Sequence, residues 1–254
     1  MPRYKLTVEY HGAGYAGWQK QPDRPSIQEA IETALAKFCG DAVEVCAAGR
    51  TDAGVHATAQ VAHIDLSKPH EPYKVMQGIN YYLFGSDQEQ APSDNHIAIT
   101  AAELVADDFH ARFSATRRSY LYRIVNRRAR LGLDAGRAWQ IGEALDAAAM
   151  QQAANILLGH HDFTSFRDSE CQAKSPIKTL DALEVRRVGE DILVRTHARS
   201  FLHHQVRIMV GTLVQVGKGR WSAQDVQRAL EAKNRSSAGP TAPPEGLYLV
   251  GVSY

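Results

Sequence analysis

The segment "CAAGRTDAGVHATAQVAHIDL", Cys46–Leu66, places a charged loop between two strand-like stretches. Apolar and polar residues alternate over 43–48 and 59–66, a pattern typical of half-buried β-strands. Glycines at both ends of the loop 49–54 allow a tight turn and a close approach of the backbone. The loop is longer and more charged than a hairpin connection requires, which makes Asp52 at its centre a candidate functional residue.

The same reasoning extends outward along the chain to an α+β fold, with mostly antiparallel sheets flanked by helices. We expect two domains, 1–105 carrying Asp52 and 106–254, with the C-terminal strand returning to a shared sheet. Further strands are predicted at 4–10, 97–105, 119–126, 179–188, 192–197 and 247–254. Helices are predicted at 27–38, 146–158 and 201–216, and one begins at Ser222.

The composition is that of a globular protein, with 44% hydrophobic and 22% charged residues among 254. The three cysteines are far apart and form no CxxC pair, which argues against a disulfide framework or a zinc knuckle and for a reducing compartment. No apolar run reaches the length needed to span a membrane, and the chain starts directly with a strand pattern rather than a signal peptide. We therefore expect a cytoplasmic protein.

The formal net charge of +1 conceals a separation of charges along the chain. Seven arginines and no acid lie between Asp108 and Asp134, and the stretch 192–224 is also free of acids. Aromatic residues are interleaved with these arginines, and together they favour a basic face for a polyanion, although a solvated surface strand is the alternative. The arginines are Arg112, Arg117, Arg118, Arg123, Arg127, Arg128 and Arg130.

A carboxylate such as Asp52 can be a general base, a metal ligand, a nucleophile or simply the cap of a turn. No second carboxylate lies in the loop, as glycoside hydrolysis would need, and no HExxH motif is present. Adjacent histidines on a helix point in different directions, so the pairs His160-His161 and His203-His204 would be poor chelators alone. The sequence therefore predicts no metal site.

The segment "SFLHHQVRIMVG" provides a second candidate, Arg207. His203, Arg207 and Gly211 recur at every fourth residue and would share one strip of a helix, with Gly211 leaving room above the arginine. There Arg207 would reach a carboxylate and favour its ionised form, or would extend along the helix edge toward solvent. Tyr120 and Tyr122 share one strand face, either as core residues or as a surface on which a base stacks.

Seven collinear motifs make the chain resemble the tRNA pseudouridine synthase A family. GRTDAGVHA is highly specific on its own, and the seven together cover nearly the whole chain. The motifs are "VEYHGAGYAGWQKQ", "SIQEAIETAL", "GRTDAGVHATAQVAH", "DDFHARFSATRRSYLYRI", "LLGHHDFTSF", "SFLHHQVRIMVGTL" and "EGLYLVGVSY".

The resemblance implies isomerisation of uridine to pseudouridine at positions 38, 39 and 40 of the tRNA anticodon stem-loop. It also implies a homodimer without metal or organic cofactor, and a two-domain fold with a central cleft. By motif, Asp52 is the nucleophile, Tyr120 contacts the target base and Arg207 is the ion-pair partner of the aspartate. Arg50 would keep the site open or the base flipped. Phosphates would be held by Arg112, Arg117 and Arg118.

Two departures from the family pattern stand out. The segment 85–94 is longer and more acidic than usual, and we expect a surface loop directed away from RNA. Gln205 occupies a position where an apolar residue is commoner, which questions the local packing. The sequence does not choose between attack of Asp52 on C1′, attack on C6, and removal of the 2′ proton. A non-catalytic RNA-binding protein and a metal-dependent nuclease are the competing hypotheses.

Overall fold

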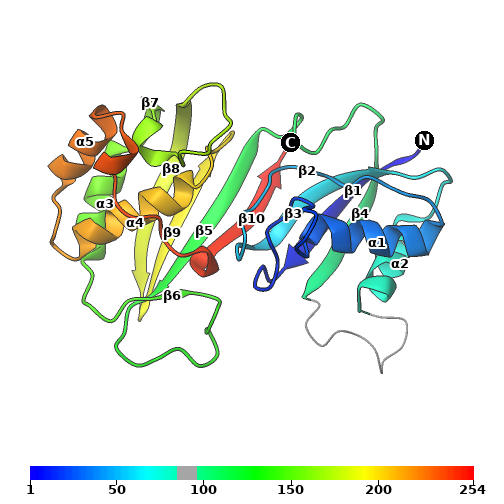
Figure 1. Ribbon diagram of the computed structural model, residues 1–254, viewed down its shortest axis with the longest axis horizontal. Coiled ribbons are helices and arrows are strands. Elements are labelled where there is room, and N and C mark those ends of the chain that lie inside the picture. The colour runs from blue at the N-terminus through cyan, green and yellow to red at the C-terminus, as the bar shows by residue number, and fades with distance from the viewer. Residues whose placement is uncertain (85–95) are drawn as a thin grey trace. The chain divides into compact units, whose positions relative to one another are not determined.

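The structure is a computed structural model that describes residues 1–84 and 96–254 (Figure 1). The chain divides into two compact units: unit 1 contains residues 1–116 and 249–254, and unit 2 contains residues 117–248. Both units combine mostly antiparallel strands with helices, which confirms the predicted α+β class. The predicted division into domains 1–105 and 106–254 stays a prediction, which limited proteolysis would test.

Unit 1 is built around a central strand with an antiparallel partner on each side. The alternation in 4–10 buries Tyr4, Leu6 and Val8 on one face, as the pattern predicts. Its strands are β1 (Arg3–Tyr10), β2 (Cys46–Ala47), β3 (His56–Asp65) and β4 (Ile97–Val105). β1 pairs with β3 and β4, and the short β2 pairs with β3.

The first helix of unit 1, α1 (Ile27–Cys39), begins and ends where the sequence predicts. The Ser26 side chain accepts a hydrogen bond from the Glu29 backbone N–H at 3.3 Å. Gly40 closes the helix with a φ of 79°, a left-handed conformation that glycine adopts without strain.

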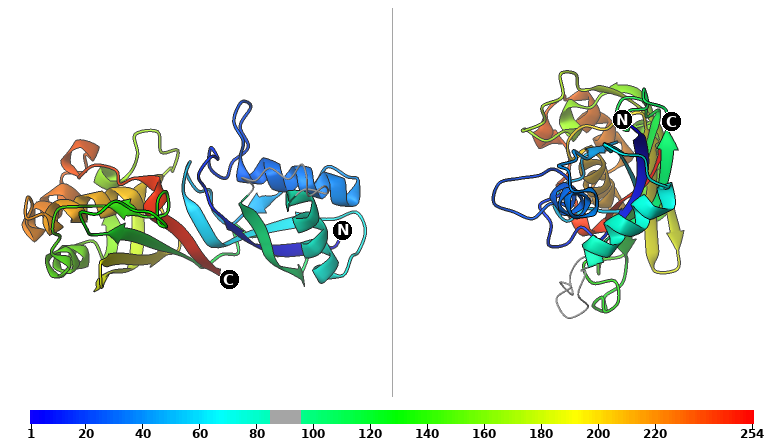
Figure 2. Two further views of the ribbon diagram at one scale, coloured as in Figure 1. Left: turned by 90° about the horizontal axis from the view of Figure 1, so that it is seen from below. Right: turned by 90° about the vertical axis from the view of Figure 1, so that its right-hand side faces the viewer.

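The second helix, α2 (Pro72–Phe84), was not predicted from the sequence. Gly78 interrupts its helical pattern, but the structure shows why a glycine is needed there. A Cβ at this position would lie 2.2 Å from the ring of Phe38, so the missing side chain lets α1 and α2 lie side by side (Figures 1 and 2). The Asn80 amide then bonds the N–H and the carbonyl of Ile99 in β4, both at 2.8 Å.

In unit 2 the strands pair in the order β5-β9-β8-β7, with all these neighbours antiparallel. The strands are β5 (Arg117–Val125), β6 (Trp139–Gln140), β7 (Gly159–Asp162), β8 (Ile177–Val188) and β9 (Asp191–Ala198). The short β6 runs parallel to β5. The last strand, β10 (Leu247–Ser253), begins in unit 2 and ends in unit 1.

Three helices complete unit 2, and the middle one forms its core. They are α3 (Ala147–Ile156), α4 (Gln205–Gly217) and α5 (Ala223–Glu231). α3 lies along β8 (Figure 1), where the Gln151 amide accepts from the Val185 N–H at 2.5 Å. Single 3₁₀ turns occur at η1 (Thr164–Phe166), η2 (Arg235–Ser237) and η3 (Pro244–Gly246).

Two predictions about histidines are wrong. His160 and His161 lie in β7 rather than on a helix. His203 precedes α4, which begins at Gln205 instead of near residue 201, so His203 does not share a helical strip with Arg207. The acidic segment 85–94 lies outside the described residues. Within 1–84 and 96–254, no helix is both long and apolar enough to cross a membrane.

Candidate active site

The loop 49–55 carries Arg50 and Asp52, and its middle is held by the segment 10–18, which starts at the last residue of β1. The Tyr10 hydroxyl and Thr51 Oγ1 lie 2.7 Å apart and share a buried hydrogen bond. The Trp18 backbone N–H donates to the Thr51 carbonyl at 3.0 Å, and the Trp18 side chain is buried. Thr51 is thus bonded through its side chain and its backbone, directly beside Asp52.

Two glycines let the segment 10–18 lie directly against this loop. A Cβ on Gly12 would lie 2.0 Å from the Val55 carbonyl oxygen, and one on Gly17 would lie 2.5 Å from the Thr51 carbonyl oxygen. The Gly12 N–H donates to Nδ1 of the buried His56 at 2.9 Å. Because Nδ1 accepts this bond, a neutral His56 carries its proton on Nε2.

The N-terminal side of the loop is fixed by a buried glutamine. Gln60 in β3 is 0% exposed, and its Nε2 donates to the Gly49 carbonyl at 2.7 Å. Its Oε1 accepts from the Val61 N–H at 3.1 Å. Since a buried amide without partners would be costly, these bonds constrain Gln60 and the loop together. Asp52 is half-buried on the loop, whereas Arg50 is exposed.

Arg207 lies in the first turn of α4 in unit 2. Its Nε donates to the Ala242 carbonyl at 2.8 Å, and its own carbonyl accepts from the Ala242 N–H at 3.1 Å. A Cβ on Gly211 would lie 1.8 Å from the Pro240 carbonyl oxygen. Gly211 therefore admits the backbone of 240–242 against the helix, and that backbone holds Arg207 instead of leaving it free to extend along the helix edge.

The start of α4 is an unusual helix terminus. His204, its N-cap residue, has a φ of 58°, a left-handed conformation uncommon outside glycine. Its Nδ1 lies 2.7 Å from Asp168 Oδ2, and the Asp168 N–H donates to the His203 carbonyl at 3.0 Å. The Glu170 N–H and then His204 lower the pKa of Asp168 below its usual range.

The hydrogen bonding of Gln205 gives a reason for a polar residue at this position, where an apolar one is commoner in the family. Its side chain is buried, and its Oε1 accepts from the Leu202 backbone N–H at 2.8 Å. The polar residue thus satisfies a backbone group at the turn into α4, which an apolar residue would leave unbonded.

The two tyrosines of β5 have different environments. Tyr122 is fully buried, donates its hydroxyl to the Pro243 carbonyl at 2.7 Å, and has a pKa raised by burial. It is a core residue, as the alternative interpretation predicts. Tyr120 is only half-buried, and its ring meets that of Phe201 edge to face at a centroid distance of 5.2 Å.

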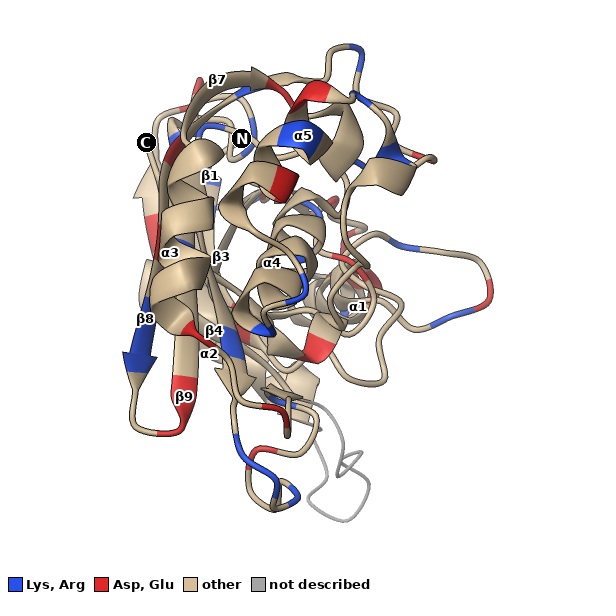
Figure 3. Cartoon of the chain, turned by 90° about the vertical axis from the view of Figure 1, so that its left-hand side faces the viewer, with Lys and Arg blue, Asp and Glu red and all other residues tan. Residues whose placement is uncertain are grey.

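The arginine-rich stretch is partly neutralised by acids from other parts of unit 2. Arg123 pairs with Asp134 at 3.2 Å, and Arg127 pairs with Glu190 at 2.9 Å in the turn between β8 and β9. Figure 3 shows the mixture of basic and acidic residues at the end of this hairpin. Arg118 is 8% exposed and donates to the Arg199 carbonyl at 2.6 Å. The exposed arginines of the stretch include Arg112, Arg117, Arg128 and Arg130.

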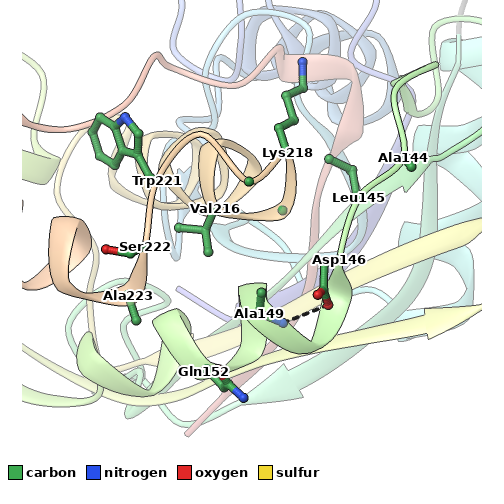
Figure 4. Close-up of a pocket in the computed structure, with 12 residues that line it drawn as sticks. Ala144, Leu145, Asp146, Ala149, Gln152, Val216, Lys218, Trp221, Ser222 and Ala223 are labelled. Carbon is green, nitrogen blue, oxygen red and sulfur yellow. Dashed lines mark hydrogen bonds between the residues drawn. The ribbon is translucent and has the colours of Figure 1, made fainter.

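A cavity of about 630 Å³ lies in unit 2 between the start of α3 and the turn from α4 to α5 (Figure 4). It is lined by Leu145, Val216, Lys218 and Trp221 among others. Asp146 at its edge caps α3 by accepting from the Ala149 N–H at 3.0 Å. None of the predicted site residues lines this cavity, so we do not assign it to the reaction.

The predicted residues thus fall into two groups. Arg50, Asp52 and Arg112 belong to unit 1, and Tyr120, Arg207, Arg117 and Arg118 belong to unit 2. Sequence reasoning missed Tyr10 and Gln60 as supports of the loop. Gly12 and Gly17 were the available signal, since closely spaced glycines indicate that backbone segments approach each other.

The chain is similar in sequence to known proteins. The sequence profile described as tRNA pseudouridine synthase matches residues 6–114 and 153–254. Proteins named tRNA pseudouridine synthase A from Mesorhizobium japonicum and Rhodopseudomonas palustris (strain HaA2) are 55% and 56% identical over 254 residues, all of both chains. One from Paramagnetospirillum magneticum is 57% identical over 254 residues, all of this chain and 96% of its own.

These matches define the class of protein as an isomerase that acts without net change in composition of its substrate. The chain belongs to the tRNA pseudouridine synthase family, and the predicted family resemblance is confirmed.

Proposed function

We propose that the chain isomerises uridine to pseudouridine at positions 38, 39 and 40 of the tRNA anticodon stem-loop, with Asp52 as the nucleophile. Its similarity to proteins named tRNA pseudouridine synthase A supports the reaction. The observation that carries the role of Asp52 is the loop itself. It holds a half-buried carboxylate beside Thr51, which is bonded at both its backbone and its side chain.

The reaction breaks the bond between C1′ and N1, turns the uracil and joins C1′ to C5. C5 loses its proton, and N1 takes up a proton, so the composition is unchanged. The target base must leave its stack before any side chain can reach these atoms. Attack of Asp52 on C1′ and attack on C6 both use the carboxylate as a nucleophile. Removal of the 2′ proton would instead use it as a base.

Tyr120 and Arg207 have supporting roles in this proposal. The half-buried ring of Tyr120 would stack on the uracil, and its hydroxyl would assist removal of the C5 proton. The Arg207 guanidinium would pair with the Asp52 carboxylate and favour its charged form. Nε of Arg207 donates to the Ala242 carbonyl, and a guanidinium carries further N–H donors on its two terminal nitrogens.

Four arginines are proposed to bind the RNA. The exposed Arg50 would hold the flipped base, and the exposed Arg112 and Arg117 would contact phosphates. The role of Arg118 in phosphate binding stays a prediction, and its bond to the Arg199 carbonyl must break or be shared for that role. We also propose a cytoplasmic homodimer, to be tested by light scattering of the purified chain.

The test uses an unmodified tRNA transcript with 5-tritiated uridine at positions 38, 39 and 40. Each isomerisation releases one tritium to water, and chemical mapping of the product locates the modified positions. We expect release that chelator does not inhibit, with the RNA chain intact. RNA binding without tritium release would favour a non-catalytic binding protein. Chelator-sensitive strand scission would favour a nuclease.

A further inference from the structure

Unit 1 exposes a large apolar side chain to solvent in an ordered turn. Phe113 is 74% exposed at the apex of the turn between β4 and β5. The Ser114 N–H donates to the His110 carbonyl at 2.9 Å, and the His110 N–H donates to Ser114 Oγ at 3.0 Å. These reciprocal bonds close the turn around Phe113 and fix the direction in which its ring leaves the backbone.

The turn is also anchored from beneath. Ala111 is buried, its N–H donates to His63 Nδ1 at 3.2 Å, and its carbonyl accepts from the Tyr254 hydroxyl at 2.9 Å. The Arg3 guanidinium donates to the carbonyl of Phe109 at 2.8 Å. Because these bonds already order the turn, a partner that contacts Phe113 would lose little conformational entropy in binding.

Three planar groups meet at this apex. The His110 and Phe113 rings have centroids 4.4 Å apart and planes tilted by 38°. The Arg112 guanidinium carbon lies 5.8 Å from the centroid of the same ring. His110 Nδ1 accepts from the Arg112 N–H at 3.1 Å, so the imidazole is fixed to the turn as well. Aromatic rings and guanidinium planes are the groups on which proteins stack unpaired bases of RNA.

The positive charge around this turn favours a negatively charged partner. No acidic residue lies between Asp108 and Asp134 in the sequence, and the exposed Arg117 follows the turn closely. A nucleic acid combines flat apolar base faces with phosphates, and this surface combines a flat apolar ring with guanidinium groups. We propose that Phe113, supported by Arg112 and His110, is a stacking platform for an unpaired base of the bound RNA. The proposal rests on the proposed function only in taking RNA as the partner.

The experiment compares three variants of the full chain in binding an unmodified tRNA transcript at fixed salt. Phe113→Leu keeps apolar bulk but removes the ring, whereas Phe113→Tyr keeps the ring. Leu104→Ala is the matched control, because Leu104 is 61% exposed in the same unit and belongs to no proposed contact. We expect Phe113→Leu to raise Kd about tenfold, with Phe113→Tyr and Leu104→Ala within about twofold of the unchanged chain.

A direct readout comes from Phe113→Trp, whose added indole fluorescence should be quenched when RNA binds, after subtraction of the unchanged chain's signal. An unchanged Kd for Phe113→Leu would overturn the proposal. A molar mass of Phe113→Leu that differs from that of the unchanged chain in light scattering would also overturn it, because Phe113 would then contact a second copy of the chain. Tritium release by the unchanged chain tests the proposed function separately. If release is absent while the binding differences hold, the platform stands and the proposed reaction fails.

Discussion

The loop 49–55 in unit 1 and the helix α4 in unit 2 position their functional candidates by different physical means. The loop is held by hydrogen bonds from Tyr10, Trp18 and Gln60. α4 carries Arg207 on a helix whose other side chains are almost all buried. We therefore expect substitutions around Asp52 to lower activity more than stability. Substitutions within α4 should mainly lower the free energy of unfolding.

The largest expected effect on stability lies in α4. Leu213→Ala removes a fully buried side chain and should lower the free energy of unfolding by about 3 kcal/mol. Urea denaturation measures the effect, with Gln227→Ala on the exposed face of α5 as the control. A loss below about 1 kcal/mol would mean that burial of this helix contributes less than the comparison requires.

For the loop 49–55, the corresponding change is Gly12→Ala in the segment that lies against it. The added Cβ would displace the Val55 carbonyl, and we expect a loss of about 2 kcal/mol together with a fall in turnover. Gly49→Ala in the same loop meets no atom within 4 Å and should leave the thermal midpoint unchanged. Equal effects of the two substitutions would show that close backbone approach does not hold the loop.

Removing the hydrogen bond between Tyr10 and Thr51 should lower activity much more than stability. Thr51→Val keeps the shape and removes the hydroxyl, so we expect a loss of about 1 kcal/mol and a decrease in kcat of about tenfold. Thr51→Ser keeps the hydroxyl and should recover most of kcat. If both variants had the same kcat, the hydroxyl would have no part in positioning Asp52.

The start of α4 should respond to pH. The pKa of Asp168 is lower in the folded chain than in the unfolded one. Its stabilising contribution is therefore complete above the unfolded value of about 4 and is lost as the pH falls through the folded value. Asp168→Asn should lose about 1 kcal/mol at pH 7, and the difference should shrink in acid. Urea titrations at several pH values measure this, with Asp181→Asn, an exposed carboxylate on β8, as the control.

Local signals explain which elements were predicted from the sequence. α1 was predicted because its cap Ser26 and its terminating Gly40 are adjacent to the residues they serve. α2 was not predicted because the reason for Gly78 is its close contact with the ring of Phe38, which lies forty residues earlier in the chain. The start of α4 was placed too early because His204 depends on Asp168, which lies far from it in sequence.

The candidate site shows the same limit. Asp52 was singled out from the sequence because its loop is charged and bracketed by glycines, but Gln60 could not be recognised as a support of that loop from its strand pattern. The arginine run also looked more basic than the folded surface is, since Arg123 and Arg127 meet acids that the run itself does not contain. Hydrogen bonds and ion pairs between distant segments are set by tertiary structure, which the local pattern does not encode.

The central claim is that the reaction needs the negatively charged carboxylate of residue 52 to start, and Asp52→Asn tests it most directly. The amide keeps the size of the side chain and removes its charge. Tritium release under single-turnover conditions should fall by at least about 10³-fold, while Kd for the tRNA transcript stays within about twofold. Release at a rate near that of the unchanged chain would contradict the claim.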